Sequence, residues 1–108
     1  MQVLHDNGGG ITQESTKHFA RAIQGVKPIQ VTIHNAGEFT FELYGTKGFD
    51  AIVVLESGFN SGYGGEGPHG SFEALKLLGV PKIVAEEVFH HQSLIIDFRS
   101  GTPTFRKA

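Results

Sequence analysis

The alternation of apolar and polar residues predicts a β-hairpin near the middle of the chain. Apolar side chains occupy every second position over residues 29–34 and again over residues 39–44. A period of two is typical of strands that bury one face. Between the two runs, Asn35-Ala36-Gly37 has the composition of a three-residue turn whose glycine can adopt a positive φ. We therefore expect two antiparallel strands joined by this turn.

Two helices are predicted on either side of the hairpin. Thr12 can cap the first helix and Gly25 can end it, which places that helix over 13–24. Good helix formers over 71–78, followed by a glycine, predict the second. The face of the first helix is marked by four apolar residues at the i, i+3, i+4, i+7 spacing: Phe19, Ala22, Ile23 and Val26.

Further strands are predicted from shorter apolar runs. Residues 51–55 form an unbroken apolar run of the kind found in buried strands, and residues 2–4 form a shorter one. Residues 94–99 alternate, and residues 104–106 can return as the edge strand of a second hairpin. Residues 83–88 fit neither period, so both a strand and a short helix remain open there.

These elements predict a small α+β fold in one domain spanning residues 1–108. The expected architecture is a single, mostly antiparallel sheet with hairpins and two helices packed on it. A chain of 108 residues is long enough for one hydrophobic core, and nine phenylalanines contribute to it.

Composition excludes several classes of function. The chain has no cysteine, which excludes disulfides, thiolate zinc sites and cysteine nucleophiles. The formal net charge is −2 and the basic residues are scattered, so we expect no nucleic-acid partner. No apolar run approaches the roughly 20 residues of a membrane-spanning helix, so we expect no membrane partner. A cytoplasmic protein without a cofactor or a metal is the expectation.

The candidate ligand site is the glycine-rich stretch over residues 57–70, SGFNSGYGGEGPHG, between the 51–55 strand and the 71–78 helix. Six of its fourteen residues are glycine, and a glycine-rich loop that leads into a helix can direct backbone N–H groups at an anion. Tyr63 could stack on a base. The candidate ligand-binding residues in this stretch and at the start of the helix are Asn60, Ser61, Gly62, Tyr63, Gly64, Gly65, Gly67, His69 and Ser71.

A second strand, glycine loop and helix occur at the start of the chain. Asp6 and Asn7 open that loop, and they join the candidate ligand-binding residues. Two such units can bring two helix N-termini to one side of a sheet. Coincidence is the favoured interpretation of this echo, because glycine loops commonly join strands to helices.

Known motifs fit the glycine-rich stretch poorly. Gly62-x-Gly64-x-x-Gly67, with Glu86 about 20 residues later, matches the dinucleotide fingerprint. However, the first glycine comes seven residues after Leu55, whereas the fingerprint turn should follow its strand at once. A P-loop is excluded because no Gly-Lys-Ser/Thr ends the stretch.

Neighbouring acidic and histidine residues raise the question of a metal site. On a helix, Glu86 would share a face with His90, and Glu87 with His91. The familiar zinc spacing His-Glu-x-x-His is absent. A solvated charged patch is the favoured interpretation.

The leading functional hypothesis is non-catalytic binding, for sensing or sequestration, of a small phosphate-bearing ligand such as a nucleotide. The first alternative is a protein-interaction module that forms a homo-oligomer, because Phe39, Phe41 and Phe59 supply much apolar surface for a small core. The second is a small hydrolase or lyase that uses a strand-end carboxylate, Glu56 or Asp6, together with His69.

Overall fold

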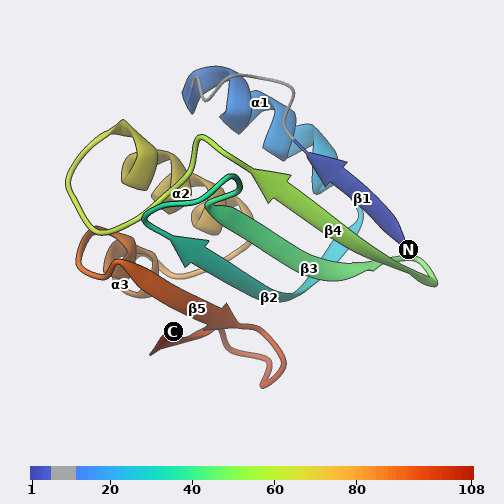
Figure 1. The fold of residues 1–108 in the computed structure, drawn as a ribbon. Helices are drawn as coiled ribbons and strands as arrows, with labels where there is room; N and C mark the ends of the chain where they lie inside the picture. Colours follow the sequence, from blue (N-terminus) through green and yellow to red (C-terminus); the bar gives the residue numbers. More distant parts are fainter. Residues whose placement is uncertain (6–11) are drawn as a thin grey trace.

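The computed structural model describes residues 1–5 and 12–108, and only the backbone of residues 12–15. The strands of this part form one six-stranded sheet in the order β1-β4-β3-β2-β5-β6 (Figure 1). In chain order the elements are β1 (Gln2–His5), α1 (Thr12–Ala22), β2 (Val26–His34), β3 (Phe41–Lys47), β4 (Asp50–Glu56), α2 (Glu66–Leu77), α3 (Lys82–Ala85), the 3₁₀ helix η1 (Glu86–Phe89), β5 (Ser93–Asp97) and β6 (Thr104–Lys107).

The sheet is mixed, with a single parallel pair among its described strands. β1 lies parallel to β4, with Val3 opposite Val53, and the other four strand pairs are antiparallel. The predicted α+β class with a mostly antiparallel sheet is therefore confirmed. Residues 83–88, which the sequence left open, are helical in α3 and η1.

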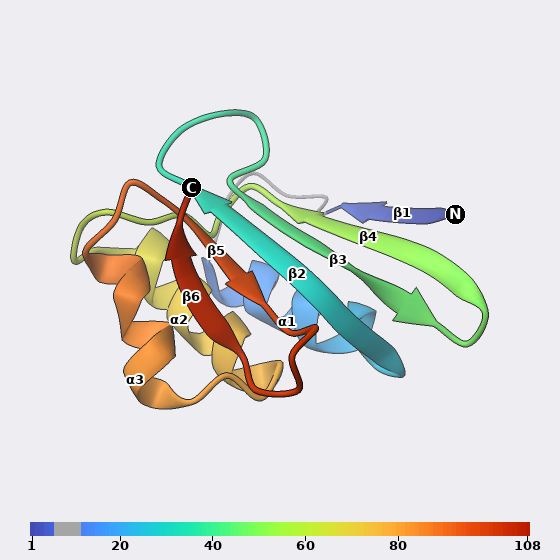
Figure 2. The same ribbon diagram turned by 90° about the horizontal axis from the view of Figure 1, so that it is seen from below.

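The helices lie on one face of the sheet, and no helix in the described part of the chain covers the other face (Figure 2). Alternate residues of the strands point toward the helices, as the period of two predicts. The core between the two layers includes a cluster of three fully buried rings, Phe19 from α1, Phe41 from β3 and Phe59 from the loop after β4. Their centroids lie 5.3–5.8 Å apart in edge-to-face geometry, which is favourable for aromatic pairs.

No helix in the described part of the chain is both long and apolar enough to span a membrane.

The predicted hairpin is present, but the prediction of a three-residue turn is wrong. Residues 35–40 connect β2 to β3, and the His34 N–H donates to the Thr40 carbonyl at 2.8 Å. The connection between β2 and β3 is longer than the predicted turn because neighbouring segments hold it in place. The side-chain amide of Asn35 donates to the Ser61 carbonyl at 2.8 Å.

The second helix begins five residues earlier than predicted, at Glu66 rather than residue 71. Glycine and proline indicate a loop when they are read locally. Here Pro68 falls in the first turn of α2, where the N–H that it lacks would have no helical partner. Gly67 is buried against Asn60. The last five residues of the predicted glycine loop, 66–70, are therefore the beginning of a helix.

The parallel pairing of β1 and β4 decides where the two helices begin. Both strands point the same way, so their carboxyl ends lie at the same end of the sheet. α1 follows β1 and α2 follows β4, and Figure 1 shows both helices starting at that end. The two units therefore bring both helix starts to one side of the sheet, which the echo in the sequence allowed.

The aromatic cluster predicts a large and local stability effect. Phe19→Ala or Phe41→Ala removes a fully buried ring, and each should lower the free energy of unfolding by about 3–5 kcal/mol. Urea denaturation followed by circular dichroism measures the change. Phe49→Ala is the matched control, because Phe49 is fully exposed between β3 and β4, and it should stay within about 0.5 kcal/mol of the parent. Equal stabilities for all three variants would contradict the packing described.

Candidate functional site

The segment between β4 and α2, residues 57–65, is held in place by hydrogen bonds to distant parts of the chain. The Gly62 N–H donates to the Val88 carbonyl of η1 at 2.8 Å. The Asn60 N–H donates to the Gly67 carbonyl at 3.3 Å, which closes the segment onto α2. Thr40 donates its hydroxyl to the Phe59 carbonyl. The loop is thus anchored at Phe59, Asn60 and Gly62.

The serines predicted to contact a ligand instead support the loop. Ser61 and Ser71 are both fully buried. The Ser61 hydroxyl donates to the Gln92 carbonyl at 3.0 Å, and the Ser71 hydroxyl donates to the Asn60 carbonyl at 2.7 Å. Both hydroxyl protons are therefore already used within the protein.

A run of unused backbone donors follows the anchored part of the loop. The N–H groups of Tyr63, Gly64, Gly65, Glu66 and Gly67 have no acceptor among the residues that the structure describes. The first N–H groups of a helix have no partner within the helix, and no side chain caps α2 at Gly65. This run combines unpaired donors with the positive end of a helix dipole.

Side chains around these donors are unevenly exposed. The Tyr63 side chain is 46% exposed and can meet a ligand. The Asn60 Oδ1 atom is buried with no hydrogen-bond partner in the described chain. His69 lies on α2 with its Nε2 atom 3.8 Å from Glu73 Oε1, so it interacts along its own helix.

The strand-end carboxylate Glu56 has a histidine partner that the sequence did not indicate. Glu56 is fully buried, and its Oε1 atom lies 3.1 Å from Nδ1 of His18 on α1. The predicted pairing with His69 is not present in the structure. His18 was missed because 38 residues separate the two partners. Its spacing of four residues from Ala22, on the predicted apolar face, was the available signal.

The remaining candidates divide into two groups. Asp6 and Asn7 lie outside the described residues. Of the acidic and histidine neighbours, Glu87 and His91 are paired, with Nε2 of His91 2.8 Å from Oε2 of Glu87. No cluster of three or more metal-binding side chains occurs among the residues 1–5 and 12–108 that could be searched.

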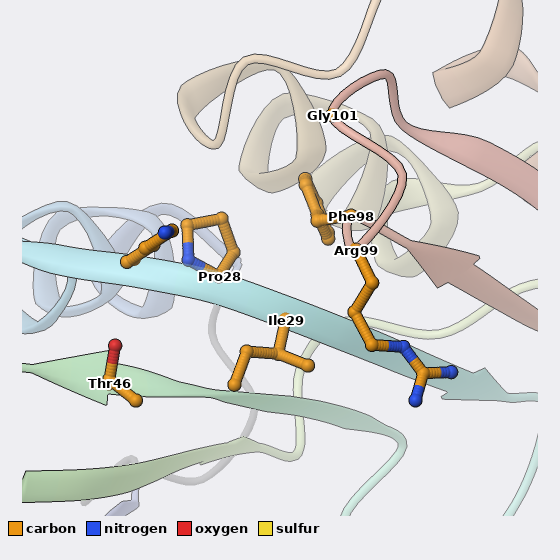
Figure 3. Close-up of a pocket in the computed structure, with 7 residues that line it drawn as sticks. Pro28, Ile29, Thr46, Phe98, Arg99 and Gly101 are labelled. Carbon is orange, nitrogen blue, oxygen red and sulfur yellow. The ribbon is translucent and has the colours of Figure 1, made fainter.

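A shallow groove of about 400 Å³ lies at the opposite end of the sheet from the glycine-rich loop (Figure 3). Arg99 borders it, but this cation is already held by Asp97 through bonds of 3.1 and 2.7 Å. The same bonds lower the pKa of Asp97 to about 2. We favour the loop over the groove as the ligand site, because the loop donors have no such partner. The groove is lined by Lys27, Pro28, Ile29, Thr46, Phe98, Arg99 and Gly101.

Comparison of the chain with protein-family models, with curated proteins and with solved structures finds no match. The fold and the site by themselves define a two-layer α+β domain. Its candidate site is a helix N-terminus, preceded by a glycine-rich loop, near the carboxyl ends of two parallel strands.

Gly64 in the loop and Gly67 in the first turn of α2 should respond differently to alanine. A Cβ at Gly67 would lie 2.7 Å from Asn60 Cγ, so Gly67→Ala should destabilise the fold by about 1–3 kcal/mol. Glycine-to-alanine changes inside helices normally stabilise. Gly64→Ala is the matched control, because a Cβ there meets open space. Thermal melting of both variants measures the difference, and adding Asn60→Ala should recover stability in the Gly67 variant. A stabilised Gly67→Ala would contradict the contact.

Proposed function

We propose that this protein binds a small phosphate-bearing molecule at the start of α2. The observation that carries the proposal is the run of five consecutive N–H groups, from Tyr63 to Gly67, that have no acceptor within the described chain. Unpaired amides at a helix N-terminus favour phosphate oxygens, because they supply both hydrogen bonds and the positive end of the dipole.

The anchoring of the loop supports this proposal. The hydrogen bonds of the Asn60 and Gly62 N–H groups fix the backbone immediately before the residues that carry the unpaired donors. Preorganised donors bind more tightly than mobile ones, since less conformational entropy is lost on binding. Ser61 and Ser71 contribute as supports rather than as ligand contacts.

Tyr63 supports a nucleotide as the form of the ligand. Its ring is partly exposed and lies beside the donors, so a base could stack on it while a phosphate meets the amides. Glu66, in the first turn of α2, opposes this with its negative charge. Its side chain is exposed, so solvent weakens the repulsion. A cytoplasmic location, favoured by the lack of cysteine, remains a prediction.

The proposal predicts the behaviour of a matched pair at Gly64. Gly64→Asp places a carboxylate beside the donors, where it competes with the ligand, and it should weaken phosphate binding at least about tenfold, or 1.4 kcal/mol. Gly64→Asn has nearly the same shape without the charge and should bind like the parent, because a Cβ at Gly64 meets no neighbour. Isothermal titration with inorganic phosphate, AMP and cyclic AMP measures both. Equal affinities of the two variants would refute the site.

Self-association is the second candidate function, and the uncovered face of the sheet favours it. On β1, β4 and β3, the exposed Val3 and Tyr44 both lie opposite Val53. His5 follows Val3 by two residues on β1 and so shares its face, and the ring centroid of Phe39 lies 6.1 Å from that of His5. Phe41 and Phe59, which the sequence predicted to contribute to such a surface, do not do so because both are buried in the core.

Light scattering tests this second candidate. Tyr44→Lys places a charge beside Val53 on the uncovered face and should convert a dimer into a monomer. Phe49→Lys is the control, because Phe49 is equally apolar but lies in the turn after β3. A parent chain that stays monomeric at millimolar concentration would exclude a homo-oligomer formed through this face.

A further inference from the structure

Glu56 occupies a position at which a carboxylate is costly. β4 alternates, so Glu56 shares the helix-facing side of the sheet with Ile52 and Val54, and all three are buried. An ionised carboxylate removed from water costs several kcal/mol unless partners stabilise it. Replacing a buried ion pair with apolar residues often stabilises a protein. The position is therefore better explained by function than by stability.

His18 is oriented by this carboxylate. Nδ1 lies 3.1 Å from Glu56 Oε1, while the imidazole remains 30% exposed at the surface of α1. When Nδ1 carries the proton and donates to the carboxylate, Nε2 has a free lone pair. Nε2 forms no hydrogen bond with the described residues. This is the arrangement in which a carboxylate holds a histidine as a base.

The pair lies at the end of the sheet from which the glycine-rich loop leads to the proposed ligand site. Glu56 is the last residue of β4. It lies at the end of the sheet where the two parallel strands finish, which is where open sheets bind ligands. Phe19 follows His18 directly, and its ring packs on Phe59 of the loop at 5.8 Å. The turn of α1 that carries His18 thus contacts the segment that leads to the donors.

We propose that His18 is the general base of a phosphate-ester hydrolase and that Glu56 is its positioning residue. Nε2 removes a proton from water, the water oxygen forms a bond to phosphorus, and the phosphorus–oxygen bond to the leaving alcohol breaks. The imidazolium then returns the proton to the departing oxygen. The products are the alcohol and the shorter phosphate. The class of substrate rests on the proposed phosphate site, whereas the role of the pair rests on its own geometry.

Turnover of bis(p-nitrophenyl) phosphate and p-nitrophenyl phosphate by the full chain tests this inference. His18→Gln should lower kcat by about 10²–10⁴-fold, the usual contribution of a general base, with KM nearly unchanged. Glu56→Gln should lower kcat by a smaller factor and change the ¹⁵N shifts of His18, because the amide no longer favours the tautomer protonated at Nδ1. His91→Gln is the matched control, since His91 is paired in a similar way with Glu87 of η1, with Nε2 2.8 Å from Oε2. It should retain the parent kcat.

Phosphate affinity, measured on the same samples, separates the two proposals. Binding without any turnover by the parent overturns the hydrolase and leaves the binding site intact. Turnover that is lost in His18→Gln but unchanged in Gly64→Asp supports the base and refutes the phosphate site. A His18→Gln variant as active as the parent overturns the inference. If the variants fail to fold, ethoxyformylation of His18 in the parent should abolish turnover, and full activity after modification would overturn the role of His18.

Discussion

The parallel pairing of β1 with β4 is the constraint on which the rest of the structure depends. It places the carboxyl ends of the two strands at the same end of the sheet. α1 and α2 therefore both start at that end and return over the same face of the sheet. The aromatic cluster joins these layers, because its rings come from α1, β3 and the loop after β4. The same pairing brings Glu56 under α1, where His18 meets it.

The glycine-rich segment has two physical roles that are separated along its length. Its first part is structural, with backbone and serine hydroxyl groups bonded to the β2–β3 connection, α2, η1 and the segment before β5. Its last part, from Tyr63 to Gly67, retains donors that the described chain does not satisfy. Anchoring the first part gives the second a defined position, which is the condition for selective binding by backbone amides.

Local patterns were sufficient to predict most of the fold. A period of two residues located the strands of the hairpin, an unbroken apolar run located the strand before the loop, and a period of 3.6 residues located α1. The predicted start of α2 was wrong because Gly67 and Pro68, read locally, indicate a loop. In the structure, the contact of Gly67 with Asn60 and the position of Pro68 in the first turn make both residues compatible with a helix. The pair of His18 and Glu56 depends on tertiary packing across 38 residues. No local period reports such a contact.

The central claim is that the amides at the start of α2 receive a phosphate. Amide ¹H–¹⁵N spectra of the parent chain, recorded during a titration with inorganic phosphate, test it most directly. The account predicts saturable shifts at Tyr63, Gly64, Gly65, Glu66 and Gly67, with little change around the groove near Lys27 and Arg99. Shifts confined to that groove, or no saturable shifts at all, would contradict it.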